Sequence, residues 1–211
     1  MEKNAHLIKN ALLAHKIAEL RDIKTEPKRF RELATDIAMI ETYEAMKDFP
    51  TITKNVTTPL EVTPQEVIDE KNVCLVPILR AGLGMEEGAH RILPNAHTGF
   101  IGMYRDETTF EVKPYFARFP KGIEKMEVLL LDPMLATGGS AIDAIEQLHK
   151  VGVTHIRFLC IIAAPEGVER VTKKFPEIPV YIGALDRELN SKCYILPGLG
   201  DAGDRIFNTL D

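Results

Sequence analysis

The sequence predicts an α/β fold in which a mainly parallel sheet is flanked by helices. Short apolar runs of strand length recur along the chain, at 73–79, 98–104, 127–132, 155–163 and 179–184. Segments with helical spacing follow three of them, at 84–93, 140–150 and 166–174. Because strands that alternate with helices favour parallel pairing, these runs are expected to form one sheet.

The N-terminal region does not follow this alternation. Residues 6–20 have the spacing of an amphipathic helix, and Thr25-Glu26-Pro27 is typical of the start of a second helix over 27–47. Residues 51–62 are rich in Thr and Val, which predicts short strands or a hairpin, and a helical turn is expected over 64–68.

The final segment, 185–211, also falls outside the alternation. Together with the N-terminal helices it is expected to form a cap or a contact between subunits. The sequence therefore predicts a single domain over 1–211, with a core of about 68–184 and a cap from about 1–67 and 185–211. Residues 105–120 mix charge, proline and aromatic side chains, and they suit a mobile arm or hairpin that closes over a site.

The composition suits a globular domain with a substantial core, since 45% of the 211 residues are hydrophobic. No apolar run approaches the roughly 20 residues of a membrane span, and the N-terminus lacks a signal-peptide pattern. Cys74 and Cys160 lie within apolar runs, as buried thiols do in a reducing cytoplasm. The net charge of −5 argues against broad nucleic-acid binding. We therefore expect a cytoplasmic protein with neither a membrane nor a nucleic-acid partner.

The most informative stretch joins an apolar strand to an acid and a glycine-rich turn. Val128–Leu131 form the strand, Asp132 follows it, and Thr137–Ser140 precede an amphipathic helix. Ligands of parallel sheets bind at the carboxyl ends of the strands. Glycines there let several backbone N–H groups converge on an anion at the helix N-terminus. The pattern predicts a monophosphate cradle beside a carboxylate for a sugar diol; an ordinary strand–turn–helix with a serine cap is the alternative.

Arginines follow two other predicted strands. Arg80 ends the run 73–79 and Arg105 ends the run 98–104, so both are expected at the same sheet edge as Asp132. A guanidinium at this edge can clamp a diphosphate through two parallel hydrogen bonds. The alternatives are a structural ion pair for Arg80 and a solvated turn for Arg105.

Other chemistries have weak signals. Gly82, Gly84 and Gly88, with Asp106 downstream, loosely resemble a dinucleotide-binding fingerprint, but the spacing is G-x-G-x-x-x-G and the unit is not N-terminal. The two serines are not in a G-x-S-x-G motif. The histidines lack H-E-x-x-H spacing, and the chain has no G-K-[ST] phosphate loop.

A glycine- and acid-rich segment, Pro197–Asp204, lies near the C-terminus. Three glycines and two acids within eight residues indicate a tight and specific backbone. Such a loop can present N–H and C=O groups to the edge of a planar base. Asp201 can accept a hydrogen bond from a ring N–H or hold a metal-bound water. A surface turn is the alternative interpretation.

Six segments, taken in order, resemble the uracil phosphoribosyltransferase family of the type I phosphoribosyltransferase fold. The resemblance covers nearly the whole chain. The segments are Lys28–Leu33, Val76–Gly84, Gly102–Arg105, Asp132–Ser140, Ala163–Gly167 and Tyr194–Asp204.

The resemblance implies transfer of the phosphoribosyl group from 5-phospho-α-D-ribose 1-diphosphate (PRPP) to N1 of uracil, which yields UMP and diphosphate in pyrimidine salvage. Asp201 and Arg105 would be catalytic, and Arg80 and Arg105 would bind the diphosphate. The implied PRPP-binding residues also include Asp132, Pro133, Met134, Leu135, Ala136, Thr137, Gly138, Gly139, Ser140 and Asp201. The implied uracil-binding residues are Ile195, Gly200, Asp201 and Ala202.

The resemblance further implies Mg²⁺ bound through the diphosphate, a homo-oligomer (dimer or tetramer) and, in some members, activation by GTP. Most type I relatives carry two adjacent acids where this chain has Asp132-Pro133. This departure matches the uracil branch and removes one diol-binding carboxylate, so no protein metal ligand is assigned. Two other interpretations stay open: a pyrimidine-sensing RNA-binding regulator on the same fold, and a sister enzyme for a purine base or orotate.

Overall fold

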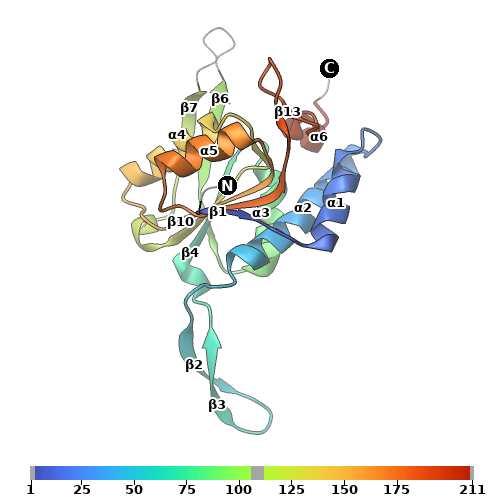
Figure 1. Cartoon of the computed structure of the whole chain (residues 1–211). Coiled ribbons are helices and arrows are strands. Elements are labelled where there is room, and N and C mark those ends of the chain that lie inside the picture. Colours follow the sequence, from blue (N-terminus) through green and yellow to red (C-terminus); the bar gives the residue numbers. More distant parts are fainter. Residues whose placement is uncertain (1–2, 106–111, 210–211) are drawn as a thin grey trace.

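The computed structural model describes residues 3–105 and 112–209, and in this part of the chain a central sheet of nine strands forms the molecule's middle layer (Figure 1). The strands of the described residues, of which β2, β3, β12 and β13 lie outside the central sheet, are β1 (Ala5–Leu7), β2 (Ile52–Thr57), β3 (Val62–Val67), β4 (Val73–Leu79), β5 (His97–Thr98), β6 (Phe100–Arg105), β7 (Val112–Arg118), β8 (Glu127–Leu131), β9 (Met134–Leu135), β10 (Ile156–Ala163), β11 (Val180–Leu185), β12 (Glu188–Leu189) and β13 (Ile195–Leu196). The helices are α1 (Ala11–Arg21), α2 (Pro27–Ala45), α3 (Leu83–Ile92), α4 (Gly139–Lys150), α5 (Pro165–Lys174) and α6 (Ala202–Phe207).

The main path of the sheet runs β1-β11-β10-β8-β4-β6-β7, with β5 beside β4 and β9 beside β10. All pairings are parallel except that of β7 with β6, which is antiparallel. The predicted α/β class with a mainly parallel sheet is therefore confirmed. Because β8, β4 and β6 are neighbours, their carboxyl ends meet at one edge of the sheet.

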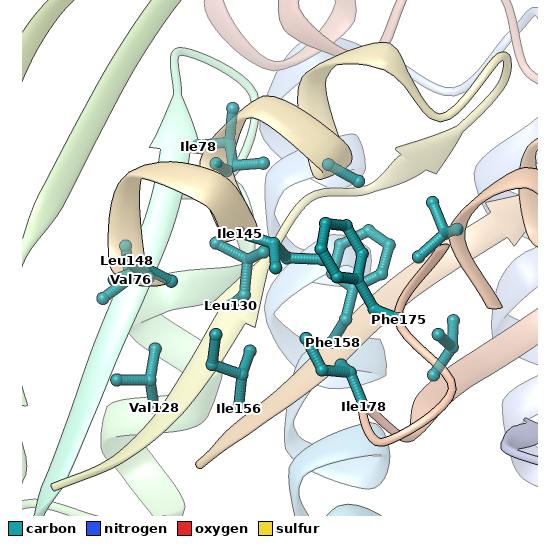
Figure 2. Packing of buried hydrophobic residues seen from close by; sticks show 14 of the residues in the cluster. Val76, Ile78, Val128, Leu130, Ile145, Leu148, Ile156, Phe158, Phe175 and Ile178 are labelled. Atoms are coloured by element: carbon teal, nitrogen blue, oxygen red, sulfur yellow. The ribbon is translucent and has the colours of Figure 1, made fainter. Parts of the chain in front are cut away.

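Helices cover both faces of the sheet. The sequence of β8 explains why, because its apolar side chains point to both faces and both must be buried. Val128 and Leu130 pack on the side of α4 and α5, whereas Leu129 and Leu131 pack on the side of α1, α2 and α3. A strand buried on both faces reads as a continuous apolar run. Figure 2 shows the first side, where Ile145 of α4 lies close to Leu130 and Phe158.

The chain between α2 and β4 differs from the expectation over 64–68. Residues 64–67 belong to strand β3, which pairs antiparallel with β2, so the predicted helical turn is wrong and the predicted hairpin extends to Val67. Pro64 lies opposite Asn55, and a two-stranded ribbon has edges where the missing N–H of proline is tolerated. The hairpin projects from the body of the molecule (Figure 1), and Leu60 at its end is 95% exposed.

The first predicted helix, 6–20, is also shorter than expected. Ala5–Leu7 form β1, which extends the sheet by pairing with β11. The helix begins at Ala11 because the Asn10 side chain accepts hydrogen bonds from the N–H groups of Leu12 and Leu13, at 2.9 and 3.1 Å.

The final segment contains elements that the sequence did not predict. β12 and β13 form a small antiparallel ribbon, and α6 follows. Arginines join this segment to the N-terminal helices: Arg31 Nη1 donates to Ile206 O at 2.8 Å, and Arg205 Nη2 donates to Asp22 O at 2.6 Å. None of the helices in the described ranges has both the length and the hydropathy of a membrane-spanning helix.

The arm predicted over 105–120 is partly described. β7 folds back on β6 as a hairpin, with Arg105 opposite Val112 in the register. Residues 106–111, including Asp106 of the loose dinucleotide fingerprint, lie outside the described residues.

Candidate active site

A cavity of about 870 Å³ lies beyond the carboxyl end of β8. This volume is in the range of small-molecule sites. One wall is formed by Asp132, Met134, Leu135, Ala136, Thr137, Gly138, Gly139, Ser140 and Ala141. A second part of the lining is formed by Gly200, Asp201, Ala202 and Gly203, a third part by Ser191, Lys192, Cys193 and Tyr194, and Ala81 completes it.

The first wall is the cradle loop (residues 132–140). Its backbone N–H groups at Ala136, Thr137 and Gly138 make no hydrogen bond to any residue in the described ranges. Gly138 has a φ of +78°, a left-handed conformation that favours glycine, and α4 begins directly after it. The first turn of a helix also has unpaired N–H groups. Unpaired N–H groups that converge at a helix N-terminus are chemically suited to an anion.

Helix α5 supports the cradle loop from behind. A Cβ added at Gly167 would lie 2.2 Å from Ala136 O, so only glycine allows this close approach. Arg170 Nη1 donates to Thr137 O at 3.2 Å. These contacts with α5 hold the loop in shape, which lowers the cost of ordering it around an anion.

The Asp132 carboxyl is half-buried where β8 ends. Burial raises its pKa to about 7; the Met134 N–H, 3.4 Å from Oδ1, opposes the shift, and the charge of Asp201 adds to it. Hydroxyl groups that donate to this carboxyl would favour its ionised form. Pro133, by contrast, is buried and turned away from the cavity, with its carbonyl accepting from the Ile162 N–H at 3.1 Å.

Arg80 follows β4 and Arg105 ends β6; β4 lies between β8 and β6, so the carboxyl ends of the three strands meet at one edge of the sheet, as the sequence predicted. The Arg80 side chain is 58% exposed, and its Nη2 lies 3.5 Å from Asp204 Oδ1. Ala81 lines the cavity but Arg80 does not. Arg105 is the last residue of β6, and its side chain lies outside what the structure describes.

Glycines of the loose dinucleotide fingerprint have packing roles instead. A Cβ at Gly82 would lie 2.5 Å from Leu131 O, and one at Gly88 would lie 2.2 Å from Thr35 O in α2. These contacts let α3 approach β8 and α2 closely. The fingerprint is therefore explained by packing.

The second wall includes the C-terminal loop (residues 195–204). Gly198 has a φ of +66°, and a Cβ there would lie 2.1 Å from Ile195 O. Ile195 itself is buried and does not line the cavity, whereas Gly200, Asp201 and Ala202 do. The loop thus brings three of the four predicted uracil-binding residues to the cavity.

Asp201 has a structural role that the sequence did not reveal. Its Oδ1 accepts a hydrogen bond from the Asp204 N–H at 2.9 Å and so caps α6. This contact fixes the carboxylate at the cavity wall. One oxygen is used by the cap, and the other is available to a ligand.

Distant residues hold the C-terminal loop in place. Asp186 is buried and accepts from Arg21 Nη1 at 2.8 Å and from the Gly198 N–H at 2.9 Å. Arg21 Nη1 also donates to Gly198 O at 2.7 Å. Arg205 Nη1 donates to Leu199 O at 2.9 Å. Sequence reasoning missed Asp186 and Arg21, because partners 165 residues apart leave no local pattern.

The ribbon tip (residues 190–194), between β12 and β13, also escaped sequence reasoning apart from Tyr194. Ser191, Lys192, Cys193 and Tyr194 all line the cavity. The signal that could have identified them is their place directly before the glycine-rich loop. Within the described part of the chain, no group of three or more His, Cys, Asp or Glu side chains gathers as a metal site would.

Solved phosphoribosyltransferases share this fold. The structure of adenine phosphoribosyl transferase from Trypanosoma brucei, in complex with AMP, pyrophosphate and ribose-5-phosphate, has a TM-score of 0.58 at 14% identity over 94% of this chain and 88% of that one. The AQ2163 protein from Aquifex aeolicus has a TM-score of 0.93 at 37% identity, over 96% and 97% of the two chains. The chain therefore has the type I phosphoribosyltransferase fold.

The sequence comparisons narrow this class. The family model described as uracil phosphoribosyltransferase matches residues 7–209. Uracil phosphoribosyltransferase from Dictyoglomus turgidum is 49% identical over 203 residues, covering 96% of this chain and 98% of the relative. The enzyme of that name from Bacillus licheniformis is 47% identical over 204 residues, covering 97% and 98%. The chain belongs to the uracil phosphoribosyltransferase family, as the motif resemblance predicted.

Proposed function

We propose that this pentosyltransferase transfers the phosphoribosyl group of PRPP to N1 of uracil and releases UMP and diphosphate. The observation that carries the proposal is the shared cavity, which has an amide-lined phosphate cradle on one wall and Gly200–Ala202 on the other. A nucleoside monophosphate needs an anion site and a base site separated by one ribose. The names of the relatives, which cover nearly the full chain, support uracil as the base.

The cradle loop would bind the 5-phosphate through the N–H groups of residues 136–140 and the hydroxyls of Thr137 and Ser140. Asp132 would accept the ribose hydroxyls. Because Pro133 replaces a second acid, a single carboxylate performs this task. Holding both ends of the ribose fixes the anomeric carbon relative to the base, which is the positioning that such a transfer requires.

Arg80 and Arg105 would stabilise the diphosphate as its negative charge develops. They lie at the carboxyl ends of β4 and β6, at the same sheet edge as β8. Arg80 Nη2 lies 3.5 Å from Asp204 Oδ1, a loose pair that a phosphate contact would replace. The β6–β7 hairpin, which begins at Phe100, would close over the donor and exclude water.

Uracil would bind against Ile195 and Gly200–Ala202, mainly through backbone groups. Asp201 is the candidate catalytic group on this wall, since its capped carboxylate has one oxygen left to orient the base or accept the N1 proton. The anomeric carbon develops oxocarbenium character as diphosphate leaves, so the nearby negative charges of Asp132 and Asp201 favour the transition state.

Magnesium is the implied cofactor, and the residues present fit it. Mg²⁺ keeps several waters and binds through one or two carboxylates plus substrate phosphates. Asp132 and Asp201 line the same cavity and are close enough for the charge of Asp201 to raise the pKa of Asp132. These two carboxylates would hold the ion's hydration shell, and the ion supplies charge neutralisation of the diphosphate.

The same proposal includes a cytoplasmic homo-oligomer, either a dimer or a tetramer, whose activity GTP would raise. The projecting β2–β3 hairpin supports association, because Leu60, Val62 and Ile52 expose 95%, 63% and 51% of their surface there. The proposed division is a single domain with its core at about 68–184 and a cap from the remaining segments. Sedimentation with and without GTP tests the association, and limited proteolysis tests the division.

Initial rates of nucleotide formation from PRPP test the activity directly. Uracil, cytosine, orotate and hypoxanthine are supplied in turn, with and without GTP. We expect UMP from uracil at a rate at least 100-fold above the other bases, because the base contacts are specific hydrogen bonds. Preference for orotate or a purine would move the protein to a sister activity. No turnover with any base, together with RNA retention in a gel-shift assay at physiological salt, would favour the regulator instead.

Arg105→Ala tests the diphosphate role. We expect kcat/KM for PRPP to fall about 100-fold, since a charge-assisted phosphate contact contributes about 1.5–3 kcal/mol. Arg118→Ala is the matched control, because Arg118 lies at the opposite end of the same hairpin, across from Phe100. Equal kinetics in the two variants would remove Arg105 from the mechanism.

A further inference from the structure

The ribbon tip (residues 190–194) has a fixed backbone. The Asn190 side chain accepts hydrogen bonds from the N–H groups of Lys192 and Tyr194, both at 2.9 Å. The Asn190 N–H donates to Tyr194 O at 2.9 Å, and the Cys193 N–H donates to Asn190 O at 2.9 Å. Four bonds within five residues hold the turn in one shape. Lys192 therefore extends from a rigid support on the cavity wall.

The tip lies on the cradle side of the cavity. Its ribbon follows β11 and is fixed to the start of α5, where Glu166 Oε1 accepts from the Leu189 N–H at 3.0 Å. The start of α5 also touches the cradle loop, at Gly167 and Ala136. Arg80 follows β4, on the other side of β8 in the sheet. The ribbon tip is therefore linked to the cradle loop through the start of α5, and Lys192 lines the cavity, whereas Arg80 does not.

Among the described residues, Arg170 contacts the cradle loop through the Thr137 carbonyl but does not line the cavity. Among the described residues that line the cavity, Lys192 has the only positively charged side chain, and Asp132 and Asp201 are acids. The Lys192 ammonium makes no ion pair within residues 3–104 and 115–209. A phosphate monoester carries up to two negative charges, whereas the cradle itself offers amides and hydroxyls.

We propose that Lys192 is a substrate-binding residue whose ammonium pairs with the phosphate monoester seated in the cradle loop, in the PRPP donor and in the UMP product alike. The identity of these ligands rests on the proposed function. The pairing itself needs only a sugar phosphate in the cradle. It assigns the ribbon tip to the phosphate end of the site, although the tip adjoins the C-terminal loop in sequence.

Calorimetric titration of wild type and Lys192→Gln with ribose 5-phosphate, UMP and uridine tests this assignment. We expect the variant to bind ribose 5-phosphate and UMP about tenfold more weakly, as for loss of one partly solvated charge-assisted contact. Uridine, which lacks the phosphate, should bind both proteins equally. Lys192→Arg should keep most of the affinity. Lys150→Gln is the matched control, because Lys150 ends α4 about 18 Å from the cradle.

Equal affinity of wild type and Lys192→Gln for ribose 5-phosphate would overturn the inference, as would an equal loss for uridine and UMP. The result is separable from the proposed activity. A wild type that fails to form UMP but binds ribose 5-phosphate through Lys192 would refute the activity and support this pairing. Normal UMP formation by wild type, with unchanged ribose 5-phosphate affinity in Lys192→Gln, would support the activity and refute the pairing.

Cys193 provides an independent readout. It is exposed beside Lys192, whereas Cys74 and Cys160 are buried and burial raises the pKa of the Cys74 thiol to about 12. Iodoacetamide should therefore alkylate Cys193 first. We expect ribose 5-phosphate to slow this alkylation at least threefold in wild type and much less in Lys192→Gln. No protection in wild type would place the tip away from the bound phosphate.

Discussion

The cradle loop and the C-terminal loop form two walls of one cavity, but they are held in different ways. The cradle loop is a continuous piece of chain between β8 and α4, supported by the adjacent α5. The C-terminal loop depends on Asp186, Arg21 and Arg205, with hydrogen bonds that span up to 184 residues. The proposed phosphate end of the site is therefore built mainly by one continuous segment, whereas the proposed base end is held by contacts between distant residues.

This difference has a functional consequence. A phosphate is bound by N–H groups that any strand–turn–helix of this shape can present. A base edge is recognised by a few hydrogen bonds at fixed positions, and a shift of 1 Å there can lower the rate about 100-fold. The C-terminal loop therefore has to be held more tightly than its own sequence can achieve, and the substitutions below separate the two walls.

The largest expected effect is that of Gly198→Ala. The new Cβ would lie 2.1 Å from Ile195 O at a φ of +66°, so the C-terminal loop has to move. We expect kcat/KM for uracil to fall at least 100-fold, while affinity for ribose 5-phosphate changes less than twofold. Gly122→Ala is the control: its φ is +82°, no atom of the described residues lies within 4 Å of its added Cβ, and it does not line the cavity. Equal losses in both variants would mean that backbone conformation alone is responsible.

Asp132→Asn changes the other wall, and we expect kcat/KM for PRPP to fall about 30-fold, within the range for loss of a charged hydrogen bond. In the wild type, ionisation of Asp132 at higher pH should lower the stability of the fold, although the ionised carboxylate is the form that accepts hydrogen bonds from the ribose. Burial raises the pKa of Asp132 from 3.8 to about 7, so folded wild type retains a proton that the unfolded chain releases. The free energy of unfolding of wild type should therefore decline between pH 4 and 7 relative to the variant.

Urea denaturation at pH 5, 6, 7 and 8 measures this difference. We expect Asp132→Asn to be the more stable protein at pH 8, where wild type holds a buried negative charge. Parallel pH curves for the two proteins would show that the Asp132 pKa is not raised in the folded state. A donor affinity equal to that of wild type would remove Asp132 from the ribose site.

Asp201→Asn and Asp201→Ala separate the charge of Asp201 from its helix cap. Both variants should lose about tenfold in kcat, because both lack the carboxylate. Only Asp201→Ala should lose about 1 kcal/mol of stability, since asparagine still accepts the Asp204 N–H that caps α6. Paired rate and thermal-unfolding measurements provide the comparison. Full kcat in Asp201→Asn would limit Asp201 to positioning the helix.

The smallest effect on activity is expected for Asp186→Asn, which weakens the support of the C-terminal loop. We expect KM for uracil to rise about fivefold with KM for PRPP unchanged, and stability to fall by about 2 kcal/mol. Glu127→Gln is the control, because its ion pair with Arg157, at 2.8 Å, lies at the opposite edge of the sheet. That variant should lose stability without a change in KM. A rise in KM for PRPP in Asp186→Asn would show that the two walls are not independent.

The sequence predicted most of the sheet and the cradle loop, because the residues that form the cradle loop are contiguous in the chain. The buried run at 127–131, the acid that follows it and the glycines before α4 are contiguous, so periodicity and turn chemistry identify them. The edge shared by Arg80, Arg105 and Asp132 followed from parallel pairing alone, and the order of β8, β4 and β6 confirms it.

The errors and omissions have a common origin in contacts between distant residues. Residues 64–67 are in a strand because they pair with β2, and Ala5–Leu7 are a strand because they pair with β11. The clamp of Arg21 on Asp186 joins residues 165 positions apart. The ribbon tip lines the cavity only because α5 fixes its base. Single-sequence patterns do not record such pairings.

A crystal structure of the protein with UMP tests the two-wall assignment most directly. The account predicts the phosphate within hydrogen-bond distance of the N–H groups of Thr137–Ser140 and of Lys192 Nζ, the ribose hydroxyls on Asp132, and the uracil edge against Gly200–Ala202. A phosphate bound at Arg80 with the base in the cradle, or UMP bound outside this cavity, would contradict it.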